Sequence, residues 1–75
     1  MITNLEISRK IAEAIKTSGL KKTEIANRIG VHHSQISRYA SGEKMPSIET
    51  FANLCIALDV DPADILGTND NNFNK

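Results

Sequence analysis

The chain of 75 residues has few of the supports on which small proteins often rely. It contains a single cysteine, so no internal disulfide can form. Its two histidines and one cysteine do not have the spacing of a structural zinc site, and we expect neither a metal nor a cofactor. A chain of this size is near the lower limit for a self-supporting core. We therefore expect one domain held together by packed helices.

Long apolar runs are also missing. No segment approaches the length of a membrane span, and the start MITNLEISRK lacks the apolar stretch of a secretion signal. We expect a cytoplasmic protein with no membrane partner. No nucleophile and base, phosphate-binding glycine loop or carboxylate pair stands out, so we expect no enzymatic activity.

The net charge of the whole chain is zero, but the basic and acidic residues are unevenly distributed along it. Residues 1–44 carry eight basic and four acidic residues, a charge of +4, whereas residues 45–75 carry one basic and five acidic residues, a charge of −4. Such charges can simply cover the solvent side of helices. A polarised molecule can also turn its basic side to phosphates while its acidic end faces away.

Apolar residues recur three and four positions apart through most of the chain, which predicts helices and no strands. The fold class is therefore all-α, with five helices at about residues 5–17, 22–29, 33–41, 47–58 and 63–66. Asn4 is the expected N-cap of the first helix. In the fourth, one stripe is expected to face the core, with Leu54 alongside it and Cys55 as a small buried hydrophobe: Ile48, Phe51, Ala52, Cys55 and Leu58.

The folded domain is expected to cover residues 1–67, and residues 68–75 form a polar, asparagine-rich tail. This composition predicts a disordered tail. Phe73 lies within it, and we interpret it as an idle aromatic residue in preference to a contact for a partner.

Two short helices joined by a tight turn are predicted in residues 22–41, KTEIANRIGVHHSQISRYAS. Ile25 and Ile29 lie one helical turn apart, and Ile36 and Tyr39 share a face of the second helix. Gly30 lies between the pairs, where a positive φ lets the chain reverse. The second helix is rich in short polar side chains, which can enter the DNA major groove.

Three segments, GLKKTEIANRIGV, SQISRYASGEKMPS and ALDVDPADILG, occur in the order typical of one family. The chain resembles the lambda repressor/Cro-like (XRE) helix-turn-helix family over about residues 5–67. The resemblance implies a compact five-helix domain that binds double-stranded operator DNA as a homodimer and regulates transcription. We expect a repressor, with the residues around Val60 and the fifth helix as the dimer surface.

The resemblance also implies which residues touch DNA. Base edges would be read by the helix from about His33 to Ser41, through His33, Ser34, Gln35, Ser37 and Arg38. Arginine can make two hydrogen bonds to guanine, and glutamine two to adenine, although the Cβ of Gln35 can point aside from the groove. Phosphates would be held by Lys21, Lys22, Thr23, Ser41 and Lys44, since the free N–H groups and dipole of a helix N-terminus attract an anion.

The chain departs from the family at three places. His32 occupies the cap position where serine or threonine is usual, so the reading helix is expected to be capped less well. Ile15 and Ala40 replace an arginine–glutamate pair, an exchange that costs little stability. The net charge is zero where many DNA-binding proteins are basic.

A different class of function is left open by the acidic second half of the chain. Antitoxins and other protein-interaction modules use the same fold, and here the acidic half or the tail would dock a protein partner. The adjacent His32 and His33 also suggest a metal or pH-sensing site, but no ligands stand at suitable spacing, so a metal is disfavoured.

Overall fold

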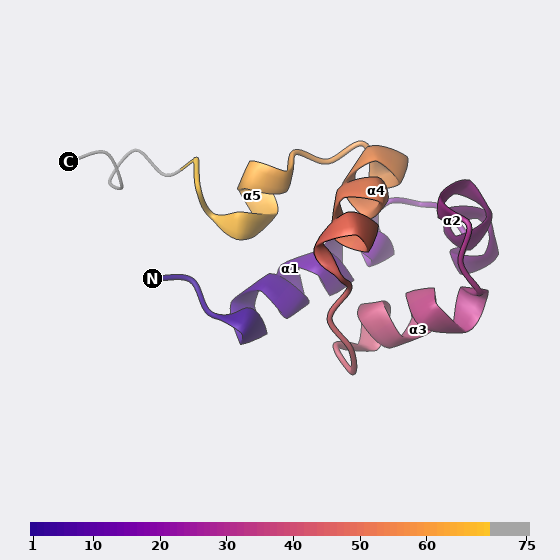
Figure 1. Cartoon of the computed structure of the whole chain (residues 1–75), viewed down its shortest axis with the longest axis horizontal. Helices are drawn as coiled ribbons and strands as arrows, with labels where there is room; N and C mark the ends of the chain where they lie inside the picture. The colour runs from indigo at the N-terminus through magenta and orange to yellow at the C-terminus, as the bar shows by residue number, and fades with distance from the viewer. Residues whose placement is uncertain (70–75) are drawn as a thin grey trace.

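The computed structural model describes residues 1–69 of the chain, and this part contains helices and no strands. The five helices are α1 (Asn4–Thr17), α2 (Lys22–Ile29), α3 (His33–Ser41), α4 (Ile48–Leu58) and α5 (Pro62–Leu66). Figure 1 shows α5 and the start of α1 at one end of the molecule, and α2 and α3 at the other. The predicted all-α, five-helix fold is confirmed. Phe73 lies outside the described residues.

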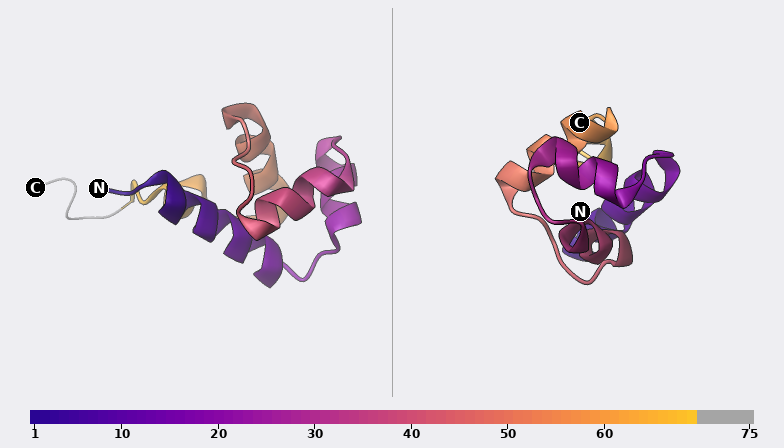
Figure 2. Two further views of the ribbon diagram at one scale, coloured as in Figure 1. Left: turned by 90° about the horizontal axis from the view of Figure 1, so that it is seen from below. Right: turned by 90° about the vertical axis from the view of Figure 1, so that its right-hand side faces the viewer.

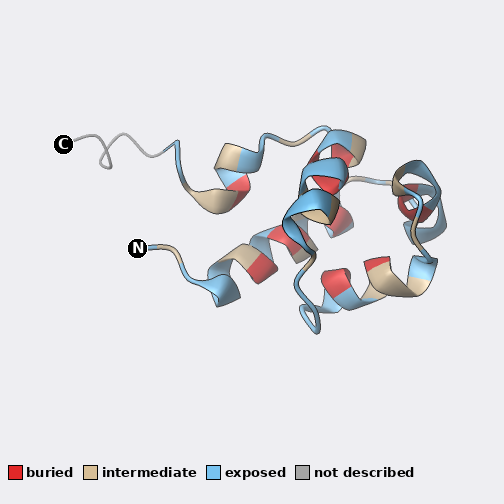
Figure 3. Ribbon diagram, viewed as in Figure 1, coloured by how far each residue is buried: buried red, intermediate tan, exposed pale blue. Residues whose placement is uncertain are grey.

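One core joins the helices. α2 packs against α3 and α4, and α1 packs against α3 and α5 (Figure 2). Figure 3 marks in red the buried residues of each helix, which include Ser8 in α1 and the apolar core. They are almost all aliphatic: Ile11, Ile15, Ile25, Ala26, Ile36, Tyr39, Ala40, Leu54, Cys55, Leu58 and Ile65. Removing this apolar surface from water is the main source of stability in a domain without disulfides.

Glycines in the left-handed backbone conformation end α2 and α3, the two helices of the candidate site. Gly30 closes α2 with φ of 75°, and Gly42 closes α3 with φ of 77°. Side chains other than glycine adopt this region at a cost, so these positions favour glycine. The reversal predicted at Gly30 is confirmed, and it sets α3 across α2.

Two expectations about helix ends and faces are wrong. Thr3, and not Asn4, is the N-cap of α1, since its hydroxyl accepts from the N–H of Glu6 at 3.2 Å. In α4, Ile48 is 88% exposed and Ala52 is also exposed. The core takes the row of Leu54, Cys55 and Leu58 instead, so Ile48 and Ala52 lie on the neighbouring face of the helix.

The apolar replacement of the family's ion pair lies in the core. Ile15 on α1 is 3% exposed and Ala40 on α3 is 4% exposed, within the same cluster of buried side chains. A buried ion pair carries a desolvation cost that apolar packing avoids. The contact between α1 and α3 is therefore hydrophobic in this chain.

Candidate nucleic-acid interface

Helix α3 has one apolar face and one polar face. Ile36, Tyr39 and Ala40 are buried against the other helices. Ser34 and Arg38 are four residues apart, and Ser41 follows three residues later, so these side chains share the side turned away from the core. Arg38 and Ser41 are exposed and Ser34 is partly so. This face is the part of α3 free to meet a ligand.

The remaining residues expected to read bases lie towards the edges of this face. His33 is exposed, while Gln35 and Ser37 are partly buried. The Oε1 atom of Gln35 accepts a hydrogen bond of 3.5 Å from the Nζ atom of Lys44, in the loop after α3. The structure thus places Gln35 beside a residue expected to hold phosphate, on the flank of the polar face.

His32 caps the N-terminus of α3. Its Nδ1 atom accepts from the backbone N–H of Ser34 at 3.2 Å and lies 2.9 Å from the Ser34 hydroxyl. The expectation of a poorly capped helix needs correction on this point, because the imidazole supplies the hydrogen bond that serine or threonine would supply. The rings of His32 and His33 lie with their centroids 4.3 Å apart.

The loop after α3 is held by the carbonyl of Arg38. That oxygen accepts from the Ser41 hydroxyl at 3.0 Å, from the N–H of Glu43 at 2.9 Å and from the N–H of Lys44 at 3.4 Å. They add to the hydrogen bond that the backbone N–H of Gly42 donates to the same carbonyl at the end of the helix. They also fold the loop back along α3, where Lys44 reaches Gln35.

The N-terminus of α2 is built differently. Its N-cap residue, Lys21, makes no side-chain capping bond, so no side chain occupies the first N–H groups of the helix. Lys21, Lys22 and Thr23 are all exposed. Two ammonium groups therefore stand at the positive end of a helix dipole, an arrangement that an anion stabilises.

Comparison with known proteins decides the family. A helix-turn-helix family model matches residues 11–65, most of the described chain. The chain belongs to the helix-turn-helix family. A search of curated proteins found no match to the sequence.

Solved structures show the same helix-turn-helix fold. The chain is similar to the restriction-modification controller protein C.AhdI from Aeromonas hydrophila, with a TM-score of 0.69 and 21% identity over 83% of this chain and 94% of that one. It is also similar to the clp gene regulator ClgR from C. glutamicum, with a TM-score of 0.67 and 25% identity over 87% of this chain and 95% of that one. The chain is a DNA-binding transcriptional regulator of the XRE type.

Two features of this helix-turn-helix site were not predicted from sequence. They are the hydrogen bonds of His32 to Ser34 and the bond between Gln35 and Lys44. The histidine at the cap position gave a signal for the first. Nothing in the spacing of residues 35 and 44 indicates the second, because it depends on the path of the loop.

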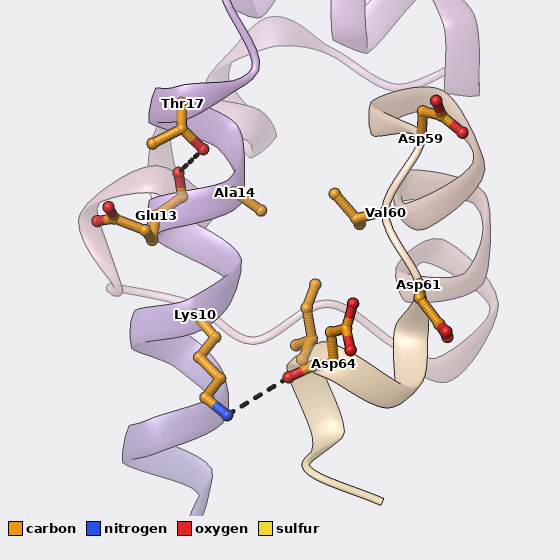
Figure 4. A pocket seen from close by; sticks show the side chains of 9 residues that line it. Lys10, Glu13, Ala14, Thr17, Asp59, Val60, Asp61 and Asp64 are labelled. Atoms are coloured by element: carbon orange, nitrogen blue, oxygen red, sulfur yellow. Dashed lines mark hydrogen bonds between the residues drawn. The ribbon is translucent and has the colours of Figure 1, made fainter. Parts of the chain in front are cut away.

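A hollow lies away from α3, between α1 and the segment that contains α5 (Figure 4). Ala14 and Val60 face one another across it, and its rim carries Glu13, Asp59, Asp61 and Asp64. The Nζ atom of Lys10 donates to the backbone carbonyl of Asp64 at 3.4 Å. Among residues 1–69 no cluster of three potential metal ligands is formed, and no helix is long and apolar enough to cross a membrane.

Proposed function

We propose that this protein is a cytoplasmic, sequence-specific repressor that inserts α3 into the major groove of operator DNA. The observation that carries the proposal is the polar face of α3, where Ser34, Arg38 and Ser41 are aligned opposite a fully buried apolar face. Short side chains let the helix approach the base pairs closely, and Arg38 can bind guanine O6 and N7 with two hydrogen bonds. His33, Gln35 and Ser37 border this contact.

Phosphates are held on either side of the inserted helix. Lys21, Lys22 and Thr23 meet one phosphate group at the N-terminus of α2, where the lysine charges and the free N–H groups act together. Ser41 and Lys44 meet another beyond the end of α3. These contacts fix the register of the domain on the duplex and carry no sequence information themselves.

A symmetric dimer completes the proposed repressor. One domain spans too few base pairs for strong discrimination, and a two-fold dimer reads two half-sites about 34–36 Å apart. Helix α5 and Val60 form the proposed contact surface. Val60, which is half-buried, supplies apolar area there, next to the acidic rim of the hollow.

The test is selection of preferred duplexes from a random DNA pool by the full chain. An enriched palindromic sequence with half-sites one helical turn apart would support both the reading role and the dimer. Enrichment of a single half-site would support reading by a monomer and refute the dimer. A pool that stays random would refute sequence-specific reading.

The acidic hollow favours a second candidate, a module of the antitoxin type whose main partner is a protein. Its apolar floor and surrounding carboxylates, Glu13, Asp59, Asp61 and Asp64, suit a basic segment with an apolar side chain. Co-purification of a second small protein from the native host, lost on substitution of Asp61 and Asp64 by lysine, would favour this candidate over the repressor.

A further inference from the structure

The proton on His32 is located by its neighbours. Nδ1 accepts from the Ser34 N–H, a group that can only donate, so Nδ1 must carry a lone pair. A neutral imidazole holds its one proton on the other nitrogen. Neutral His32 therefore caps α3 through Nδ1 and directs an Nε2–H away from the Ser34 backbone.

The Ser34 hydroxyl is oriented by the same atom. Its oxygen lies 2.9 Å from Nδ1, a distance that requires one hydrogen between them. Because Nδ1 carries no proton, that hydrogen is the hydroxyl's own, and it shares the one lone pair of Nδ1 with the Ser34 N–H. The remaining lone pairs of the Ser34 oxygen then point away from His32, so this side chain offers the polar face of α3 an acceptor and no donor.

Protonation of His32 reverses both effects. Nδ1 then carries a hydrogen and cannot accept from the Ser34 N–H, so the cap is lost and a positive charge stands at the positive end of the helix dipole. The new N–H can donate to the Ser34 oxygen instead. This frees the hydroxyl hydrogen to donate towards the groove.

His32 makes no ion pair within residues 1–69. The titratable group stacked on it is His33. In α2, Arg28 donates to Glu24 and to the Ala57 carbonyl. Lys21 and Lys22 stand at the opposite end of that helix, which is about 12 Å long at 1.5 Å per residue. Within residues 1–69 no carboxylate lies within 4.0 Å of an imidazole nitrogen.

We infer that neutral His32 is the positioning residue of the reading helix and sets Ser34 as a hydrogen-bond acceptor towards the bases. The inference rests on the proposed reading role of α3. Neutral His32 makes Ser34 complementary to the exocyclic amines of adenine and cytosine, whereas the protonated form favours the acceptors of guanine and thymine. Protonation of His32 should therefore weaken sequence discrimination.

The first arm of the test needs no DNA. Imidazole ¹⁵N shifts of the full chain should show Nδ1 of His32 unprotonated at about pH 8, and the Ser34 amide proton should move with the His32 titration. A proton on Nδ1 at that pH, or a Ser34 amide that ignores the titration, would overturn the inference. This arm decides the matter even if the protein binds no specific DNA.

The second arm measures the ratio of affinities for the selected duplex and its scrambled version, in which the uniform attraction of added charge for phosphates cancels. From about pH 8 to about pH 5.5 the ratio should fall about fivefold, the factor that corresponds to the ~1 kcal/mol of an N-cap. H32S keeps a capping side chain that does not titrate, so its ratio of affinities for the two duplexes should not change with pH. H32A should have a low affinity ratio at every pH.

The outcomes separate the two hypotheses. An H32S profile that falls as steeply as that of the unaltered protein would overturn the role of His32. Equal binding of both duplexes by the unaltered protein at every pH would refute the proposed reading function instead, and the ¹⁵N arm would still decide whether His32 positions α3.

Discussion

The Nζ atom of Lys44 donates to the Oε1 atom of Gln35 at 3.5 Å, which ties the loop after α3 to the first half of that helix. An ammonium group only donates, so the amide must turn its oxygen to Lys44 and its NH₂ group the other way. Gln35 thus offers a donor on its free side. This orientation disfavours the paired contact with adenine, which needs both amide atoms.

Lys44 is also proposed to hold a DNA phosphate, and this role can be tested separately. K44M should weaken binding to all duplexes alike and reduce the slope of log affinity against log salt by about 0.9, the value for one lost phosphate contact. The measurement is a salt titration of binding by fluorescence anisotropy. K10M is the matched control, because Lys10 reaches the Asp64 carbonyl on α5, and its slope should not change. An unchanged slope for K44M would refute the phosphate contact.

Core packing predicts a contrast between two isoleucines. Ile36 is 0% exposed and Ile48 is 88% exposed. I36V should lower the free energy of unfolding by about 0.5–1.5 kcal/mol, because it leaves a small cavity. I48V should change it by less than about 0.5 kcal/mol, as expected for a surface site. Urea denaturation measures both, and equal losses would contradict the assigned packing of α3 and α4.

The dimer proposal predicts that Val60 matters for association. V60D should convert the dimer to a monomer, since it places a carboxylate in an apolar contact that already has an acidic rim. I56D is the control, because Ile56 is 78% exposed on α4 and lies outside the proposed surface. Sedimentation reads the mass, and circular dichroism confirms folding. An unaltered protein that is monomeric both free and on a two-half-site duplex would end the proposal.

The single thiol should be inert in the folded state. Burial, and secondly the Asp61 carboxylate, raises the pKa of the Cys55 thiol above its ordinary value of 9.0. Since the folded state holds this proton more tightly, the stabilisation is present below the unfolded pKa and is lost as the pH rises towards the folded pKa. The unfolding free energy should therefore fall above about pH 9, by at most about 1.4 kcal/mol per pH unit. Urea denaturation at alkaline pH measures the loss, and C55A should remove it.

A thiol reagent gives an independent check on Cys55. At neutral pH the folded protein should react far more slowly than the chain in urea, because the side chain is 3% exposed. Rapid labelling of the folded protein would contradict its place in the core.

Most of the fold could be predicted from the spacing of apolar residues and from the residues that favour turns. The spacing of Ile25, Ile29, Ile36 and Tyr39 and the glycine at position 30 were enough to predict two helices and their turn, since each rule acts within one or two helical turns. The face of α4 was predicted less well. Ile48 and Leu54 are both compatible with an apolar stripe, and only the packing of α4 on α2 decides that Leu54 is buried.

The candidate site also has one part that the sequence predicts and one part that it does not. The polar face of α3 could be predicted because it is the complement of the buried face. The bond from Lys44 to Gln35 could not, because it joins two residues through a loop of irregular backbone. The sequence predicts a weak cap at His32, because imidazole is an uncommon capping group. The capping hydrogen bond depends on the orientation of the ring, which the sequence does not give.

The most direct test of the central claim compares R38A with K22A on the selected duplex and on a panel of its single base-pair variants. If α3 reads base edges, R38A should weaken the binding free energy for the selected sequence by about 1–3 kcal/mol. It should also no longer discriminate at one base pair of each half-site. K22A should weaken all members of the panel by a similar factor. Discrimination by R38A that equals that of the unaltered protein at every position would contradict the account.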